Sequence, residues 1–328
     1  MRGWMADAMA RTRVANRVPY LNIVLFFATV LTTVLAGATQ TGFQAPAVSG
    51  GAAAHALAEA GAILVAGLPF ATALIAILLS HEMGHYLVAR SYHVDSTLPF
   101  FIPVPVGPVG TFGAVIRIRS ALPSRRATLD IGAAGPFAGF AVAVPLLAWG
   151  LAHSEVREVG PAVLASPPLG VVQLVHAWIS GDHLLSGELQ HYGDSVVTWA
   201  VQRLVVGKLA PGTDVFLHPV AFAAWIGLFV TTLNLIPIGQ LDGGHVTYAL
   251  LGRRGARAFS RVVSLGLLVA GLFLSWNWFV WWVVTRFLVG YGHPPARDEE
   301  PLGPGRRAWA IAALVLFALT FIPIPVSL

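Results

Sequence analysis

Long apolar runs constrain the fold of this chain more than any other feature of its sequence. Six segments are dominated by apolar side chains: residues 21–38, 68–89, 129–151, 215–251, 262–290 and 308–321. About 20 such residues are needed for a helix to cross a bilayer, and a helix satisfies its own backbone hydrogen bonds inside lipid. Only 11% of the 328 residues are charged, whereas soluble domains carry about 25%. The sequence therefore predicts an all-α polytopic membrane protein.

The number of crossings depends on residues 262–290. This stretch could be one tilted helix, which gives six transmembrane helices. It could also be a helical hairpin that turns near residues 275–278, where Ser275 and Asn277 interrupt the apolar run, and this gives seven. Pro69 is expected at the start of the second long helix, because proline is tolerated in the first helical turn.

Basic residues predict the orientation of the protein in the membrane. They are concentrated in residues 1–19, 90–126 and 253–261, and loops rich in Lys and Arg remain in the cytoplasm. The N-terminus is therefore expected in the cytoplasm, and residues 39–56 and the insert at 153–215 are expected outside. The net charge of +5 is explained by these topology signals, so no nucleic-acid partner is expected. Helix 21–38 is interpreted as a retained helix and not as a cleaved signal peptide.

The segment after residue 91 departs from the helical pattern. Prolines and glycines between positions 99 and 113 break any helix, and residues 114–120 alternate between apolar and polar side chains as a strand does. A small β-structure or a re-entrant loop is therefore predicted between the second and third long helices. In the insert, residues 173–179 and 196–206 are predicted to form short amphipathic helices.

Ionisable residues well inside the apolar runs are few, and they identify the candidate functional site. Burying such groups in a membrane is costly, so they need a functional reason. The set comprises His81, Glu82, His85, Asp242 and His245.

The segment His81-Glu82-Met83-Gly84-His85 has the HExxH pattern of a zinc site. On a helix, residues four apart share one face, so both histidines can bind the same ion. Glu82, beside the first of them, is placed to act as a general base on a zinc-activated water. The chain has no cysteine, so thiolate ligands are excluded.

A catalytic zinc site usually has three protein ligands, so a third must come from elsewhere in the chain. Asp242 is the best candidate, because it lies in an apolar run beside two glycines that allow close approach of the backbone. His245, three residues further on, is a rival ligand. An Asp and a His at this spacing can also form a supporting hydrogen bond behind the metal.

Residues 81–85 (HEMGH) and 234–244 (NLIPIGQLDGG) resemble the two motifs of the site-2 protease family of intramembrane zinc metalloproteases. Residues 110–114 (GTFGA) and 134–139 (AGPFAG) resemble the branch that includes plant chloroplast members, and no PDZ-like domain is evident between the motifs. The resemblance covers about residues 65–250. It implies zinc on His81, His85 and Asp242, with Glu82 as the catalytic base.

The resemblance also implies a role in substrate or oxyanion binding for Asn234. Phe112 and Gly113, at the start of the predicted strand, are further candidates for substrate binding, because an exposed strand edge can pair with an unwound peptide. The expected reaction is hydrolysis of peptide bonds in or near transmembrane segments, and the expected substrate is a membrane protein with a single transmembrane helix. The expected location is a bacterial inner membrane.

Two other readings of the motif stay open. Prenyl-protein proteases also carry HExxH on a membrane helix, but their third ligand is typically a Glu, and no Glu follows Glu82 in any apolar run. A transporter or receptor that only binds metal would not need Glu82. The whole chain, 1–328, is interpreted as one integral-membrane protease domain, with its core at 65–250, a cytoplasmic segment at 1–19 and an extracytoplasmic insert at 153–215. The sequence does not indicate the oligomeric state.

Overall fold

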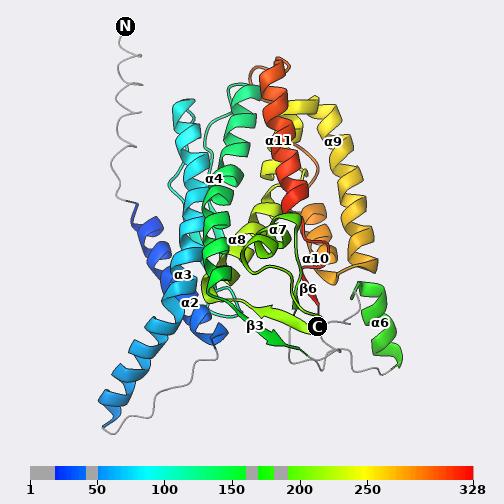
Figure 1. Ribbon diagram of the computed structural model, residues 1–328. Coiled ribbons are helices and arrows are strands. Elements are labelled where there is room, and N and C mark those ends of the chain that lie inside the picture. The colour runs from blue at the N-terminus through cyan, green and yellow to red at the C-terminus, as the bar shows by residue number, and fades with distance from the viewer. Residues whose placement is uncertain (1–18, 42–50, 160–168, 181–190, 328) are drawn as a thin grey trace.

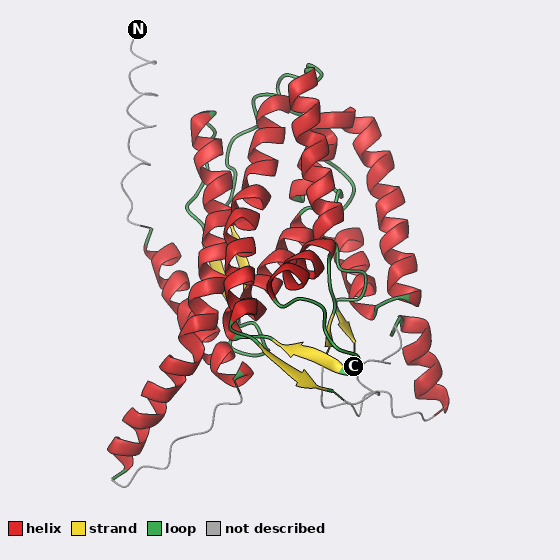
Figure 2. Cartoon of the chain, in the orientation of Figure 1, coloured by secondary structure: helices red, strands yellow, loops and turns green. Residues whose placement is uncertain are grey.

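The computed structural model describes residues 19–41, 51–159, 169–180 and 191–327. The expectations for residues 1–18, and for 160–168 and 181–190 of the insert, lie outside the described residues. The described part is mainly a bundle of tall helices, with some short strands near one end and others among the helices (Figures 1 and 2).

Four of the described helices are long and apolar enough to cross a membrane: α2 (Tyr20–Gln40), α3 (Ala52–Ser91), α4 (Arg125–Ala152) and α9 (Asp242–Phe273). Shorter apolar helices complete the bundle: α8 (Pro219–Asn234), α10 (Trp276–Val284) and α11 (Pro304–Thr320). The prediction of an all-α polytopic membrane protein is therefore confirmed.

Helix α3 differs from the prediction at its beginning. It runs without a break for 40 residues, and Pro69 lies inside it rather than at its start. A proline removes one backbone hydrogen bond, which neighbouring helices and local Thr side chains can compensate in a transmembrane helix. Thr72 Oγ1 donates to the carbonyl of Leu68 at 2.7 Å, within this turn. Residues 52–56, expected in a loop, form the first turns of the same helix.

The stretch 262–290 is a hairpin, as the seven-crossing alternative expected. Helix α9 ends at Phe273, and α10 starts at Trp276 after a turn. The two helices pack closely, since a Cβ on Gly271 would lie 2.4 Å from the Phe279 nitrogen. The returning arm is short: α10 has nine residues and the following π-helix η1 (Thr285–Val289) has five. Non-helical chain leads from there to α11.

The predicted β-structure after α3 is a hairpin of β1 (Phe100–Pro103) and β2 (Thr111–Val115), which are antiparallel. Strand β2 starts and ends earlier than the predicted strand at 114–120. Beyond it, the chain continues to pair with residues 95–97, because Arg119 donates its backbone N–H to Asp95 at 2.8 Å. The sequence pattern therefore identified the paired region but not the limits of the regular strand.

The strands β3 (Glu155–Glu158) and β5 (Thr213–Phe216) of the insert lie at one end of the bundle, whereas its helix at 196–205 packs against α4 and α8. Strand β3 pairs with β5, and β4 (His191–Tyr192) pairs with the C-terminal strand β6 (Val326–Ser327). The two predicted amphipathic helices are present as α6 (Val171–Ser180) and α7 (Val196–Val205).

Helices α3, α4 and α8 form the centre of the bundle, and small residues allow their close approach. A Cβ on Gly227 of α8 would lie 2.7 Å from the Ile77 side chain of α3, and one on Gly84 of α3 would lie 2.6 Å from the carbonyl oxygen of Ala134 in α4. Small residues at such contacts are typical of membrane helix pairs. This packing holds the polar residues of α3 against α4 and α8.

Candidate metal centre

His81 and His85 occupy one face of α3, one turn apart, and both are buried. His85 Nδ1 lies 2.7 Å from the carbonyl oxygen of Ile131 in α4. A carbonyl oxygen only accepts hydrogen bonds, so Nδ1 carries the proton and the neutral ring presents an unprotonated Nε2 on its other side. A partner of this kind fixes the tautomer and orientation of a metal-binding histidine.

Asp242 reaches the same point from a different part of the chain. Helix α8 ends at Asn234, a tight connection follows, and α9 begins at Asp242. The connection is closely packed, since a Cβ on Gly243 would lie 1.9 Å from the Leu235 carbonyl oxygen and one on Gly244 would lie 2.3 Å from that of Gly239. The two glycines therefore allow the chain to bring Asp242 to α3.

Three ligand atoms converge at this point. The distance between His81 Nε2 and His85 Nε2 is 3.2 Å, and Asp242 Oδ2 lies 3.2 Å and 3.3 Å from these two atoms. With a neutral His85 ring, His85 Nε2 and the carboxylate can both present lone pairs to a shared cation. Ligands at about 2.0–2.1 Å in a tetrahedral site are about 3.3 Å apart, so the three atoms fit a tetrahedral metal ion.

Glu82 lies beside this group and is buried, with 6% of its surface exposed. It interacts electrostatically with His85 and Asp242, and with the backbone of Ile116 just beyond β2. A buried carboxylate that is not one of the three converging ligands is free to exchange protons with a water molecule beside it.

Two glycines of α4 leave the space that the histidine rings occupy. A Cβ on Gly135 would lie 2.1 Å from His85 Nε2, and one on Gly139 would lie 3.2 Å from His81 Cβ. The sequence AGPFAG contributed to the family resemblance, but its place against the histidines depends on how α3 and α4 pack. The Ile131 carbonyl that orients His85 was not identified from the sequence for the same reason.

Asn234 lies next to the centre, with its Nδ2 3.3 Å from His81 Nε2. His245 does not join the three ligands. Its Nδ1 is 2.6 Å from Nε2 of His293, whose own Nδ1 lies 2.7 Å from the carbonyl oxygen of Pro294. His293 Nδ1 is therefore a donor, and His245 donates to His293 Nε2. The His293 ring also stacks on Tyr248, a contact the sequence did not indicate.

Phe112 and Gly113 lie in β2 and are not among the three converging ligands. The Phe112 side chain is 79% exposed. Gly113 has a φ of 95° and donates its N–H to Thr111 Oγ1. Among the described residues β2 pairs only with β1, so its other edge has no strand partner.

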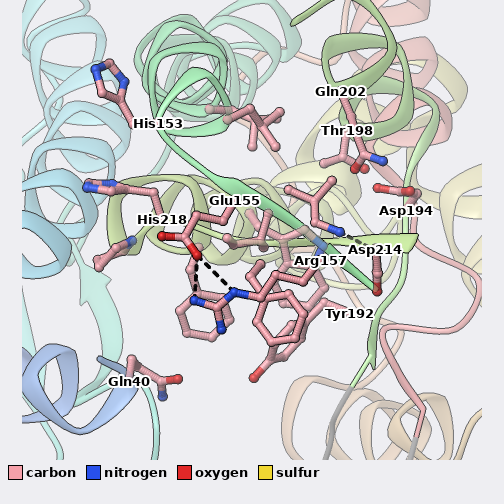
Figure 3. A pocket seen from close by; sticks show the side chains of 18 of the residues that line it. Gln40, His153, Glu155, Arg157, Tyr192, Asp194, Thr198, Gln202, Asp214 and His218 are labelled. Carbon is pink, nitrogen blue, oxygen red and sulfur yellow. Dashed lines mark hydrogen bonds and ion pairs between the residues drawn. The ribbon is translucent and has the colours of Figure 1, made fainter. Parts of the chain in front are cut away.

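A separate pocket of about 480 Å³ lies at the end of the bundle that carries β3 and β5 (Figure 3). None of the converging ligands lines it. Its charged side chains include Glu155 and Arg157, which form an ion pair at 2.6 Å, and the rings of His153 and His218 lie near its edge. This pocket therefore does not contribute to the candidate metal centre.

The arrangement defines a class of protein: a polytopic membrane protein in which two membrane helices bring together two histidines and an aspartate beside a buried glutamate. Residues 69–276 match the model of peptidase family M50, and this span includes all four of these residues. The chain belongs to this family, the site-2 protease family.

Named relatives agree with this assignment. The chain is 32% identical over 262 residues to the Arabidopsis thaliana protein named probable zinc metalloprotease EGY1, chloroplastic. The matched region covers 79% of this chain and 43% of that relative. It is 31% identical over 264 residues to the EGY2 protein of that plant, with 80% and 42% covered. The chain thus spans less than half the length of these relatives. No solved structure matches it significantly.

Proposed function

We propose that this chain is a zinc metalloendopeptidase that hydrolyses peptide bonds in or near the transmembrane segments of membrane proteins. The observation that carries the proposal is the convergence of His81, His85 and Asp242 on one buried point with a spacing that fits a tetrahedral ion. Membership of peptidase family M50, and relatives named zinc metalloproteases, support the reaction class.

His81 Nε2, His85 Nε2 and Asp242 Oδ2 would hold the zinc ion, one through each atom. When bound, zinc supplies Lewis acidity that activates water and polarises a carbonyl group. The hydrogen bond from His85 Nδ1 to the Ile131 carbonyl would keep the ring oriented for binding the ion through Nε2. Two helices must be in place for this set to form, so folding of the bundle and metal binding are coupled.

Glu82 acts as the general base and acid. Its carboxylate takes a proton from the attacking water and passes it to the leaving amine, so the carboxylate is regenerated in each cycle. Burial beside the ligands keeps this carboxylate positioned and excludes bulk water. Asn234, whose amide nitrogen lies beside His81, would donate a hydrogen bond to the oxygen of the scissile carbonyl as negative charge develops.

The substrate peptide would add to the open edge of β2. A transmembrane helix satisfies its own amides, so it must unwind before it can be cut, and a strand edge offers new partners for those amides. The interaction of Glu82 with the backbone of Ile116, one residue past the end of β2, supports a peptide bound along this edge. Gly113 and the exposed Phe112 would contact the peptide, which in this proposal comes from a protein with one transmembrane helix.

The remaining expectations concern the whole chain. We place the basic end of the bundle in the cytoplasm and treat residues 1–328 as one protease domain with its core at 65–250. A bacterial inner membrane stays a prediction, since the named relatives are chloroplastic.

The decisive experiment compares Glu82→Gln with wild type. Both proteins are purified in detergent, and their zinc content and cleavage of a model transmembrane substrate are measured. The variant is expected to bind zinc as wild type does and to cleave about 10²–10⁴-fold more slowly. Glu59→Gln is the matched control, because it makes the same chemical change at an exposed position of the same helix.

Two results would contradict the proposal. If Glu82→Gln cleaves at the rate of wild type, Glu82 is not the base. If wild type binds zinc but cleaves no transmembrane substrate, the protein is a metal-binding membrane protein and not a protease of this type.

A further inference from the structure

Four arginines form a cluster at the bend of α9. Gly252, with φ 71° and ψ 177°, divides this helix into two segments. The second segment begins with the cluster, which comprises Arg253, Arg254, Arg257 and Arg261 and encloses a pocket of about 370 Å³. All four side chains are exposed, and in the described part of the chain none of them forms an ion pair.

The cluster continues directly into an apolar, exposed helix face. Arg257, Arg261 and Leu265 are four residues apart and therefore lie on one side of α9. Below them, exposed apolar side chains follow to the end of the helix: Val262 (67% exposed), Leu265 (60%), Val269 (50%) and Phe273 (52%). From Arg261 to Phe273 the helix rises about 18 Å, which is close to the depth of one leaflet of a bilayer's hydrocarbon core, about 15 Å.

The arginines are exposed and lie where the apolar face of α9 begins. Arg261 lies two turns into the helix from Arg253, at the level where the apolar face starts, and charged groups at that depth need a counter-charge or access to water. The protein supplies no carboxylate to them among its described residues. An arginine guanidinium binds phosphate through paired hydrogen bonds, so a phosphate group at this level would complete the cluster.

We propose that the arginine cluster of α9 is a binding site for an anionic phospholipid. Its phosphate and headgroup lie among Arg254, Arg257 and Arg261, and its acyl chains lie along the apolar face that runs from Val262 to Phe273. The apolar face favours a lipid over a soluble phosphate compound, because only a lipid fills both parts of the surface. The site is separate from the metal centre and does not depend on the proposed protease activity.

Lipid binding by the detergent-purified protein tests the proposal. Native mass spectrometry with equal amounts of phosphatidylglycerol and phosphatidylcholine is expected to show preferential retention of phosphatidylglycerol. Each basic side chain near an anionic headgroup strengthens binding about fivefold, so Arg257→Gln with Arg261→Gln should weaken phosphatidylglycerol binding about 30-fold. The double variant Arg257→Lys with Arg261→Lys keeps the charge and should retain most of the binding.

The matched control is the double variant Arg90→Gln with Arg119→Gln. It removes two exposed arginines, one from the last turn of α3 and one from the segment between α3 and α4. It should change phosphatidylglycerol binding less than about twofold. Equal retention of the two lipids by wild type would overturn the proposal, and so would an equal loss in the control. Displacement of the lipid by millimolar inorganic phosphate would assign the cluster to a soluble anion instead.

Discussion

Gly135 is the residue whose missing side chain leaves room for the His85 ring. We predict that Gly135→Ala removes metal binding, because the added Cβ would lie 2.1 Å from His85 Nε2, in the space of the ion's ligand. Gly139→Ala should have a smaller effect, since its Cβ would lie 3.2 Å from His81 Cβ. Zinc content of the purified variants, measured by atomic emission, checks both.

The control for these variants is Gly266→Ala in α9, where an added Cβ meets nothing within 4 Å. This variant should bind zinc as wild type does. Retention of full zinc content by Gly135→Ala would show that the ring positions differ from those described.

Asp242 and His245 were rival ligands in the sequence, and their contacts give them different roles. We predict that Asp242→Ala loses zinc, because Asp242 Oδ2 is one of the three converging atoms. His245→Ala should keep zinc but lower stability by about 1–3 kcal/mol, since it leaves the buried His293 Nε2 without its donor. Zinc content and the melting temperature of each variant separate the two effects. Zinc loss by His245→Ala alone would reverse the assignment.

The spacing of His81 and His85 could be predicted from the sequence, because it follows from helix geometry alone. Asp242 could be found as one of few ionisable residues in apolar runs. The Ile131 carbonyl, Gly135 and His293 could not, since their roles depend on which faces of α3, α4 and α9 meet. Local sequence does not specify those faces when helices are apolar on all sides.

At the level of elements, the N-terminus of α8 has a titratable cap. His218 Nδ1 accepts the backbone N–H of Val220, so the ring must be unprotonated at Nδ1 for the cap to exist. Burial, together with the nearby His153 ring, lowers the pKa of His218 below its usual value. Figure 3 shows both rings at the edge of the pocket. The neutral ring is therefore the form that the folded state favours.

This cap predicts a pH dependence of stability with a definite sign. Because the folded-state pKa is lower than the unfolded one, the contribution of His218 is complete above pH about 6.5 and decreases as the pH falls below it. His218→Asn replaces the ring by a cap that does not titrate. The melting temperature of both proteins is measured at pH 7 and at pH 5. Its decrease between these two pH values should be about 2 °C smaller for the variant than for wild type.

Melting curves by intrinsic fluorescence across this pH range test the cap. His55→Asn, at an exposed position of α3, is the control and should follow wild type. Parallel pH profiles for wild type and His218→Asn would mean that the His218 cap does not titrate in this range.

Helices could be located from apolar runs, but two details of the elements could not. Pro69 was expected at a helix start, yet α3 continues through it, packed against α2 at Gly67 and against α8 through the stacked rings of Phe70 and Phe222. The bend of α9 at Gly252 depends on a φ of 71° at this residue. Next to the bend, Arg125 of α4 donates hydrogen bonds from Nε and Nη2 to the carbonyl oxygen of Ala249. Such long-range contacts have no pattern in the local sequence.

For the molecule as a whole, the two basic clusters within the described residues, at 90–126 and 253–261, lie at one end of the bundle. Arg125 connects the start of α4 to the first segment of α9 through the Ala249 carbonyl, and Arg306 of α11 pairs with Asp130 of α4. Helix α3 ends on the same side as α4 begins, and β3 lies at the opposite end of α4 (Figure 1). Residues 90–126 and 253–261, which the sequence predicts on one side of the membrane, therefore lie at the same end of the bundle.

This arrangement predicts which end faces the cytoplasm, and the absence of cysteine makes the test direct. Single cysteines are introduced at Ser91 and Ala258 on the basic end, and at Glu158 and Pro211 on the other; all four positions are exposed. Because basic loops remain inside, a membrane-impermeant maleimide should label Cys at 158 and 211 in intact cells. Cys at 91 and 258 should react only after the cells are permeabilised. The reverse pattern would put the arginine cluster of α9 in the outer leaflet and the β3–β5 end in the cytoplasm, against the positive-inside rule.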